Sequence, residues 1–175
     1  MTRRIVTGQR ADGKSVIVSD DIVAAKQVTL LPGSTFTQLW GSDDVVDLPT
    51  DGTQPAWTQF FPPEHGFRFL LWTIPPVTTQ LPADIDLGVA LEELQRDLPG
   101  LVEFNEPDQP GMHTTHTVDL DVVVAGELWL ELDDGEEVHL QAGDCVIQNG
   151  TRHAWHNRSD QVTTILTAIV GARRT

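Results

Sequence analysis

The sequence has few cationic residues and a single cysteine. Lysine and arginine together number 11, against 26 aspartate and glutamate residues, so the formal net charge is -15. Nucleic-acid binders need basic surface to neutralise phosphates, and the same negative charge opposes contact with an anionic membrane. With Cys145 alone, an internal disulfide framework and a cysteine-based zinc module are excluded. The apolar neighbours of Cys145 indicate that it is a small buried hydrophobic residue.

Several other features are missing. No apolar run approaches the roughly 18–20 residues that a membrane helix needs, and the first residues lack the apolar stretch of a signal peptide. We therefore expect a soluble, cytoplasmic protein. The chain has no tyrosine, which removes one common general acid and base. It also has neither a G-x-S-x-G elbow nor a glycine-rich phosphate loop, so serine-nucleophile and phosphate-loop chemistry have little support.

Short segments rich in β-branched residues alternate with glycine and proline turns along the chain. Their spacing predicts an antiparallel sandwich or barrel. The expected strands are Arg4–Thr7, Ser15–Ser19, Phe36–Trp40, Phe67–Ile74, Val118–Val124, Leu128–Leu132, Glu137–Leu140, Cys145–Gln148 and Thr163–Val170. The 175 residues suit one domain with a sizeable core. We expect strands, a loop and a short helix in residues 1–105 and the barrel in residues 106–175 of this single domain.

The clearest strand pattern lies in the C-terminal half. Leucines at positions 128, 130 and 132 alternate with Trp129 and Glu131, and this period of two places the leucines on one face. The following residues, 133–136, predict a hairpin turn in which Gly135 takes a positive φ.

The N-terminal half contains a long loop and one helix candidate. Residues 48–64 are rich in proline, threonine and glycine, and we expect this loop to pack its aromatic residues against the barrel. Residues 82–99 favour a helix with Asp84 or Asp86 as its N-cap and a stripe of leucines at helical spacing: Leu87, Leu91, Leu94 and Leu98.

Histidines are clustered in two short segments. His113 and His116 form one pair, His153 and His156 form another, and Asp119 follows His116 by three residues. Imidazole and carboxylate groups together suit Fe, Mn, Ni, Zn or Cu. Antiparallel neighbours can bring the ends of two such segments together, although His156 alternates away from His153. The pattern therefore favours a metal site.

Two motifs carry a resemblance to a known family. Residues 113–119, followed by Gly126, resemble the first motif of the cupin family, which has two histidines, an acid and, after six intervening residues, a glycine. Residues 143–157 resemble the second motif, which has a glycine, a turn, a histidine and an asparagine. The match covers residues 111–170, and the overall layout resembles small bacterial single-domain cupins.

The resemblance implies an all-β fold: a double-stranded β-helix, or jelly-roll barrel, with N-terminal extension strands and one short helix. It also implies a divalent metal ion, which would be Fe, Mn, Ni or Zn, at the wide mouth of the barrel. Carried over residue by residue, it makes His113, Asp119 and His153 metal ligands. An aspartate stands where the motif has glutamate, and Gln148 replaces the usual proline of the second motif.

The second histidine of the first motif is displaced by one residue. The motif places it at position 115, which is Thr115 here, and the histidine is His116. We expect a bulge at the start of the strand to turn His116 toward the metal as a fourth ligand. The alternative is that His116 points to solvent, which leaves two histidines and one carboxylate, the triad of non-haem iron oxygenases.

Four residues are candidates for lining a substrate pocket: Arg68, Phe69, Trp72 and Trp155. Such tryptophans often only fill a core. Arg68 is the only cationic residue between Lys26 and Arg96, and it could hold an anionic substrate group or simply pair with one of the surplus carboxylates.

The family resemblance leaves the reaction open, because cupins support many reactions. We expect a metal-dependent enzyme acting on a small organic acid or ketone, as a lyase, dehydratase, decarboxylase or dioxygenase. The alternative is a cupin that binds a small ligand without turnover. Cupins often pair through their sheets, so the resemblance also implies a homodimer.

Overall fold

The computed structural model describes residues 1–174. Its elements in chain order are β1 (Thr2–Gln9), β2 (Ser15–Val23), β3 (Thr35–Ser42), β4 (Phe67–Ile74), α1 (Leu87–Asp97), β5 (Thr117–Ala125), β6 (Glu127–Glu131), the short 3₁₀ turn η1 (Asp133–Gly135), β7 (Glu137–Gln141), β8 (Cys145–Asn149), β9 (Ala154–His156) and β10 (Thr163–Gly171). The strands expected from the sequence are confirmed, and β9 is an additional short strand.

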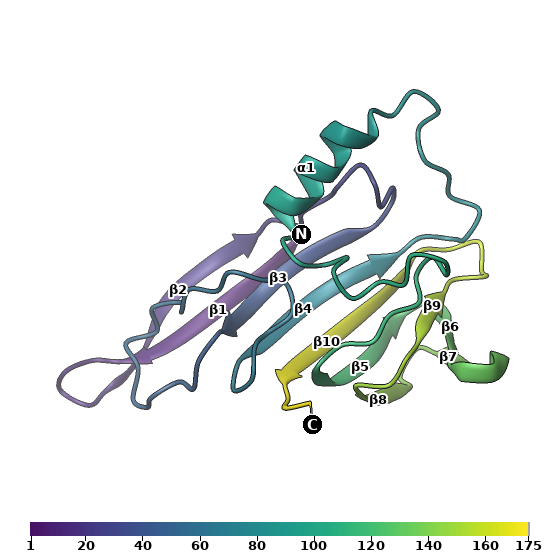
Figure 1. The fold of residues 1–175 in the computed structure, drawn as a ribbon. Helices are drawn as coiled ribbons and strands as arrows, with labels where there is room; N and C mark the ends of the chain where they lie inside the picture. Colours follow the sequence, from purple (N-terminus) through teal and green to yellow (C-terminus); the bar gives the residue numbers. More distant parts are fainter. Residues whose placement is uncertain (175) are drawn as a thin grey trace.

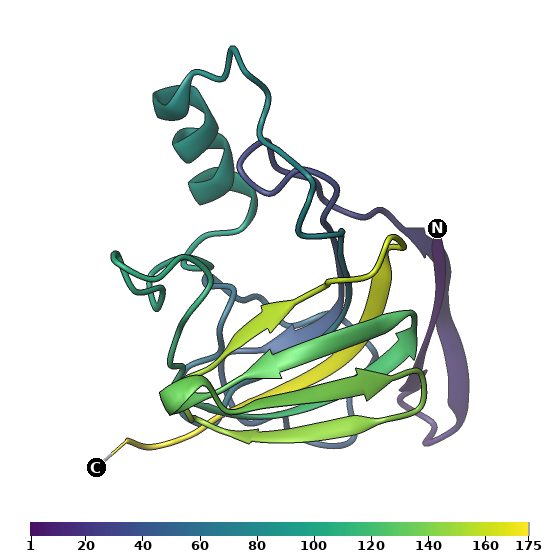
Figure 2. The ribbon, with the colours of Figure 1, turned by 90° about the vertical axis from the view of Figure 1, so that its right-hand side faces the viewer.

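Two antiparallel sheets form the barrel. The larger sheet has the strand order β3-β4-β10-β5-β8, and the smaller has the order β7-β6-β9. Figures 1 and 2 show the two sheets curving toward each other, so the expected all-β jelly-roll barrel is confirmed. Between them lies a core of Val123, Leu130 and Leu140, with Trp155 packed against it.

The first hundred residues extend this barrel. β3 and β4 join the larger sheet, where β4 pairs with β10, whereas β1 and β2 form a separate hairpin. In the long loop that connects β3 to β4, Phe60 is buried in a second core together with Phe36 and Leu70. The expectation that this loop packs aromatic residues against the barrel is therefore confirmed.

Helix α1 begins where the sequence predicted. The Asp86 side chain accepts hydrogen bonds from the backbone N–H groups of Gly88 and Val89, which are 2.9 and 3.2 Å away. The leucine stripe was only half right, because Leu94 and Leu98 are buried while Leu87 and Leu91 are exposed. The helix stands to one side of the barrel mouth, and its C-terminal half packs on the second core (Figure 2). Among residues 1–174, no helix has the length and apolar character needed to cross a bilayer.

The hairpin predictions for the C-terminal half are confirmed, with one correction nearby. Leu128 and Leu130 are buried, and Gly135 has a φ of 73°. The prediction that Cys145 is buried was wrong, since it is an exposed free cysteine. In β8 the inward positions belong to Val146 and Gln148, so strand alternation turns Cys145 outward.

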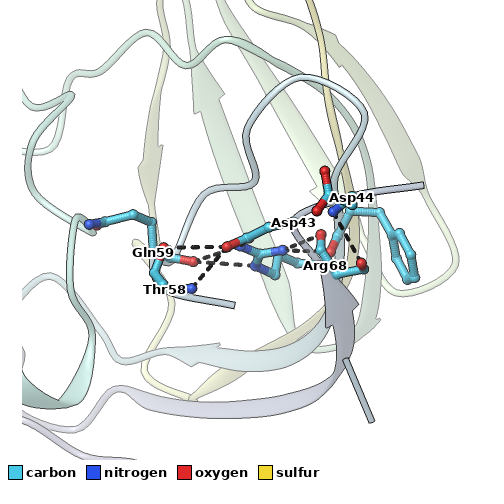
Figure 3. A network of polar contacts seen from close by, with 7 residues as sticks. Asp43, Asp44, Thr58, Gln59 and Arg68 are labelled. Carbon is cyan, nitrogen blue, oxygen red and sulfur yellow. Dashed lines mark hydrogen bonds and ion pairs between the residues drawn. The ribbon is translucent and has the colours of Figure 1, made fainter. Parts of the chain in front are cut away.

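Arg68 ties the loop of residues 43–66 to the barrel (Figure 3). It is 3% exposed, and each of its three nitrogens donates hydrogen bonds. It contacts the backbone carbonyls of Ser42 at 2.7 Å, Phe67 at 2.9 Å and Gln59 at 2.9 Å, and it forms an ion pair with Asp43. The buried guanidinium therefore links the end of β3, the loop and the start of β4 through their backbone carbonyls.

We predict that Arg68→Met lowers the free energy of unfolding by about 3 kcal/mol or more, because it leaves the Asp43 carboxylate and several carbonyls without their buried partner. Thermal and urea unfolding followed by circular dichroism measure this change. Arg96→Met is the matched control, since Arg96 is exposed and pairs only with its neighbour Asp97. Equal effects of the two substitutions would contradict the role assigned to Arg68.

Candidate functional site

A cavity of about 250 Å³ lies inside the barrel. Its wall is mainly aliphatic and aromatic, and its polar lining groups are few: Ser34, Asn105, His113, Asp119, Asp121, His153 and Thr167. An apolar cavity with a few converging polar groups is the usual form of a small-molecule site.

His113 and His153 are held side by side in this wall. Each backbone N–H donates to the other residue's carbonyl at 2.9 Å, so the two residues form an isolated antiparallel bridge. Their imidazole ring centroids are 4.2 Å apart. The two histidine segments are thus brought together, although they stand forty residues apart in the sequence.

The hydrogen bonds of the two rings fix their tautomers. Nδ1 of His113 lies 2.9 Å from the Gly111 carbonyl oxygen, and Nδ1 of His153 lies 2.9 Å from that of Thr151. A carbonyl can only accept, so each Nδ1 carries a proton and each neutral ring keeps a lone pair on Nε2. Burial lowers both pKa values, that of His153 to about 4 with a contribution from His113. Both imidazoles are therefore neutral at pH 7.

Asp119 is buried on the inner face of β5 and lines the same cavity. Its Oδ1 has no hydrogen-bond partner among the described residues, and burial raises the pKa of the carboxyl to about 7. The directly opposed residue in β8 is Gln148, whose Nε2 also lacks a partner. Two complementary polar atoms therefore lie buried and unpaired on neighbouring strands, which is costly in a protein interior.

Asp121 is a second buried carboxylate that the sequence analysis missed. It lies two residues after Asp119 and therefore on the same inner face of β5. Its Oδ1 accepts a hydrogen bond of 2.6 Å from Thr167, whose hydroxyl accepts one of 2.8 Å from the indole N–H of Trp72. Burial raises the pKa of Asp121 to about 6. The alternation Asp119-Leu120-Asp121 was the signal that would have found it.

The structure does not bring His116 to the other three proposed ligands. His116 lines a second cavity of about 460 Å³, and its ring packs edge-on against Phe104 at 5.6 Å. Thr115 is the buried residue here, and its hydroxyl hydrogen-bonds that of Thr117 at 2.7 Å. His116 lies in a bend just before β5, with an exposed side chain between the buried Thr115 and Thr117, so it does not face the cavity of the two paired histidines.

The pocket candidates divide into two groups. Trp72 and Trp155 line the cavity, and Trp155 packs edge-on against His153 at 5.5 Å. Phe69 and Arg68 do not line it: Phe69 is 42% exposed on the outer face of the larger sheet, and the N–H groups of Arg68 are taken by the loop described above.

The donor chemistry of the cavity suits a divalent metal ion. His113 and His153 offer two neutral imidazoles, and Asp119 offers a carboxylate with an unpartnered oxygen. Within residues 1–174, however, no three His, Cys, Asp or Glu side chains already stand close enough to hold an ion. For His113, His153 and Asp119 to bind one ion together, their side chains would have to rotate. The Asp119 oxygen has no hydrogen bond that such a rotation would break.

The fold is a jelly-roll barrel with two paired histidines in the wall of its cavity. Residues 100–170 match the family model described as a cupin domain. The matched segment contains strands β5 to β10 and both histidine segments, so this part of the chain resembles a cupin domain. Over its whole length it also resembles the cupin domain of Cnp3 from Schizosaccharomyces pombe, with a TM-score of 0.50, 8% identity, and coverage of 98% of this chain and 88% of that one. At that identity the likeness shows the fold alone.

Related sequences come from fungi. The chain is 34% identical over 100 residues to Oryzines biosynthesis cluster protein J of Aspergillus oryzae, covering 52% of this chain and 56% of that protein. It is 42% identical over 59 residues to Phomopsin biosynthesis cluster protein C' of Diaporthe leptostromiformis, covering 34% and 31%. It is 25% identical over 100 residues to the cupin-domain-containing oxidoreductase virC of Hypocrea virens, covering 54% and 52%.

These matches span about half the length of the relatives, or less. Because the relatives are fungal, the expected likeness to bacterial cupins is not confirmed.

We predict that Asp119→Asn becomes more stable relative to the unsubstituted protein as pH rises from about 4 to about 7, with chelator present. The pKa of Asp119 is raised from 3.8 to about 7, so its contribution is fully present below pH 3.8 and is lost as pH rises through 7. Asparagine has no such proton. Urea unfolding of both proteins at several pH values measures the difference. Asp121, His113 and His153 are present in both proteins, so their own contributions cancel in this comparison.

The exposed Asp134→Asn variant serves as the control and should follow the unsubstituted protein at every pH. A stability difference for Asp119→Asn that does not change with pH would show that this carboxyl is not desolvated as the structure has it.

Proposed function

We propose that this chain is a metal-dependent cupin enzyme that transforms a small organic acid or ketone in the cavity of the barrel. The observation that carries the proposal is the pair of neutral imidazoles, His113 and His153, placed in one cavity wall with the unpartnered carboxylate of Asp119. These three residues would hold the ion.

The chain's own residues prepare this site. The reciprocal backbone hydrogen bonds position both rings, and the carbonyls of Gly111 and Thr151 keep the protons on Nδ1 so that Nε2 is the atom left for a metal. The aliphatic and aromatic wall would contact the apolar part of a bound substrate. A divalent ion held here would polarise a substrate oxygen or bind O₂ if it were redox-active iron.

Among the reaction classes expected from the sequence, the geometry favours the oxygenase. With His116 in another cavity, the proposed ligands are two histidines and one carboxylate, the facial triad typical of non-haem iron oxygenases. The similarity to a protein named a cupin-domain-containing oxidoreductase supports the same class. A four-ligand site, which would favour a lyase, needs His116 to turn inward.

One observation favours a second candidate, a cupin that binds a small ligand without turnover. No three donors are already grouped for an ion in residues 1–174, and Gln148 lies opposite Asp119 as an alternative hydrogen-bond partner. In that case the cavity would bind its ligand without a metal.

We predict that His113→Ala and His153→Ala each reduce metal binding at least about tenfold while the barrel stays folded, because each removes one of few donors from a preformed scaffold. Asp119→Asn should weaken binding as well. Elemental analysis of untagged protein, followed by titration of Fe²⁺, Mn²⁺, Ni²⁺ and Zn²⁺ into chelated protein, measures the effect.

His139→Ala and His116→Gln are the matched controls. His139 pairs with Glu127 at 2.8 Å outside the cavity, and His116 lines the second cavity, so both variants should keep full occupancy. Metal-free purified protein that binds none of the four ions would favour the second candidate. A large loss of metal binding with His116→Gln would instead support a four-ligand site that includes His116.

We also propose that the protein forms a homodimer through the outer face of the larger sheet. The outward positions of β4, β10, β5 and β8 carry no charged residue, although the chain has a net charge of -15. Seven large apolar side chains on this face are 40–56% exposed: Phe69, Val118, Leu120, Val124, Ile147, Leu166 and Val170.

A second copy is the occupant that this face suits. It is the surface on which two acidic chains can meet without opposing carboxylates, and two sheet faces can pack as in a β-sandwich. The register places Leu120 beside Ala168 of β10 and Ile147 of β8, at the centre of the face. Contiguous exposed apolar patches of this kind are unusual on monomers.

We predict that Leu120→Glu converts the dimer to a monomer, because it places a charge at the centre of both apposed faces. Sedimentation equilibrium measures the mass in solution. Leu81→Glu, at an exposed loop position away from the sheet, should leave the dimer intact. An unsubstituted protein that sediments as a monomer at high concentration would contradict the proposal.

A further inference from the structure

Asp121 has no role in the proposed metal site, yet it is the second carboxylate of the cavity. It is 7% exposed and lines the cavity wall. Thr167 donates to Oδ1, and the Trp72 indole N–H occupies the Thr167 oxygen, so the direction of both hydrogen bonds is fixed. Oδ2 is thus the carboxylate oxygen left for a ligand, and it is held in place by a network that reaches across β5, β10 and β4.

The charged side chains of the cavity are all acidic. Among the described residues that line it there are two aspartates, two neutral histidines and no lysine or arginine. Arg68, the nearest candidate in the sequence for pairing with a substrate anion, is buried in its own network with Asp43. A carboxylate or phosphate group on a ligand would find no counter-charge from the protein.

A metal ion in the proposed site would not reverse this balance. The charge of a divalent ion is offset once by Asp119 and once by Asp121, whereas a site with two histidines and a single carboxylate keeps one positive charge for an anionic substrate. With Asp121 the formal charge of the cavity and its ion together is zero. That balance suits an uncharged ligand.

We propose that Asp121 is the specificity-determining residue of the cavity and that it selects an uncharged, largely apolar ligand carrying a hydroxyl or enolisable ketone group over a carboxylate of the same size. The apolar wall, which includes Phe36, Phe60, Trp72 and Trp155, takes the body of the ligand. Asp121 accepts the ligand's O–H and repels anions. This inference rests on the proposed function. Of the two substrate classes named there, it favours the ketone over the organic acid.

The test uses a matched pair of probes, benzyl alcohol and benzoate, titrated at pH 8 into the purified protein. Ligand-observed NMR measures the dissociation constants, and elemental analysis of the same samples gives the metal content. We expect benzyl alcohol to bind at least about tenfold more tightly than benzoate, since tenfold corresponds to only about 1.4 kcal/mol of discrimination. Asp121→Asn should reduce this ratio by about threefold or more, mainly through tighter benzoate binding.

Asp134→Asn is the control, because it removes the same charge from an exposed turn and should leave the ratio unchanged. Benzoate binding as tightly as benzyl alcohol, or the absence of binding by both, would overturn the inference, and the unsubstituted protein alone decides this if Asp121→Asn fails to fold. Discrimination that persists in protein binding no metal would show that the proposed function fails while the selectivity stands. If metal-loaded protein bound both probes equally well, the proposed selectivity would be wrong while the proposed metal site would stand.

Discussion

Asp119 and Asp121 occupy neighbouring inward positions of β5, inside a barrel whose cavity has no lysine or arginine among its described lining residues. Removing two carboxylates from water without a cation is expensive, which is why burial raises both pKa values. Thr167 partly compensates Asp121, while an oxygen of Asp119 stays unpaired. The site is thus arranged around a deficit of positive charge, which a bound cation would correct.

Other parts of the fold hold the histidines in this cavity and keep cationic side chains out of it. The bridge between His113 and His153 fastens the two motif segments together at the barrel mouth. Arg68 is buried but does not line the cavity, because Asp43 and backbone carbonyls of the loop hold its guanidinium. Arg68 therefore stabilises the loop, and the cavity is left without a cation from its described lining residues.

Sequence patterns predicted much of this structure. Strand alternation and turn glycines located the strands and the hairpin at Gly135, and Asp86 was correctly among the candidate caps of the helix. The pattern could not reveal that Cys145 faces outward, because a short apolar run does not show which of its faces meets the core. Nor could it show where His116 points, since His116 lies in a bend before β5 and its ring packs against Phe104, which is distant from the strand pattern.

The proposed metal site consists of His113, His153 and Asp119. X-ray absorption spectroscopy of the Co²⁺-loaded protein tests it most directly, because imidazole rings give a distinct scattering pattern whose amplitude counts them. Two imidazole nitrogens are expected at about 2.0–2.2 Å, with oxygen atoms completing the shell. A shell of three imidazoles, or one with none, would contradict it.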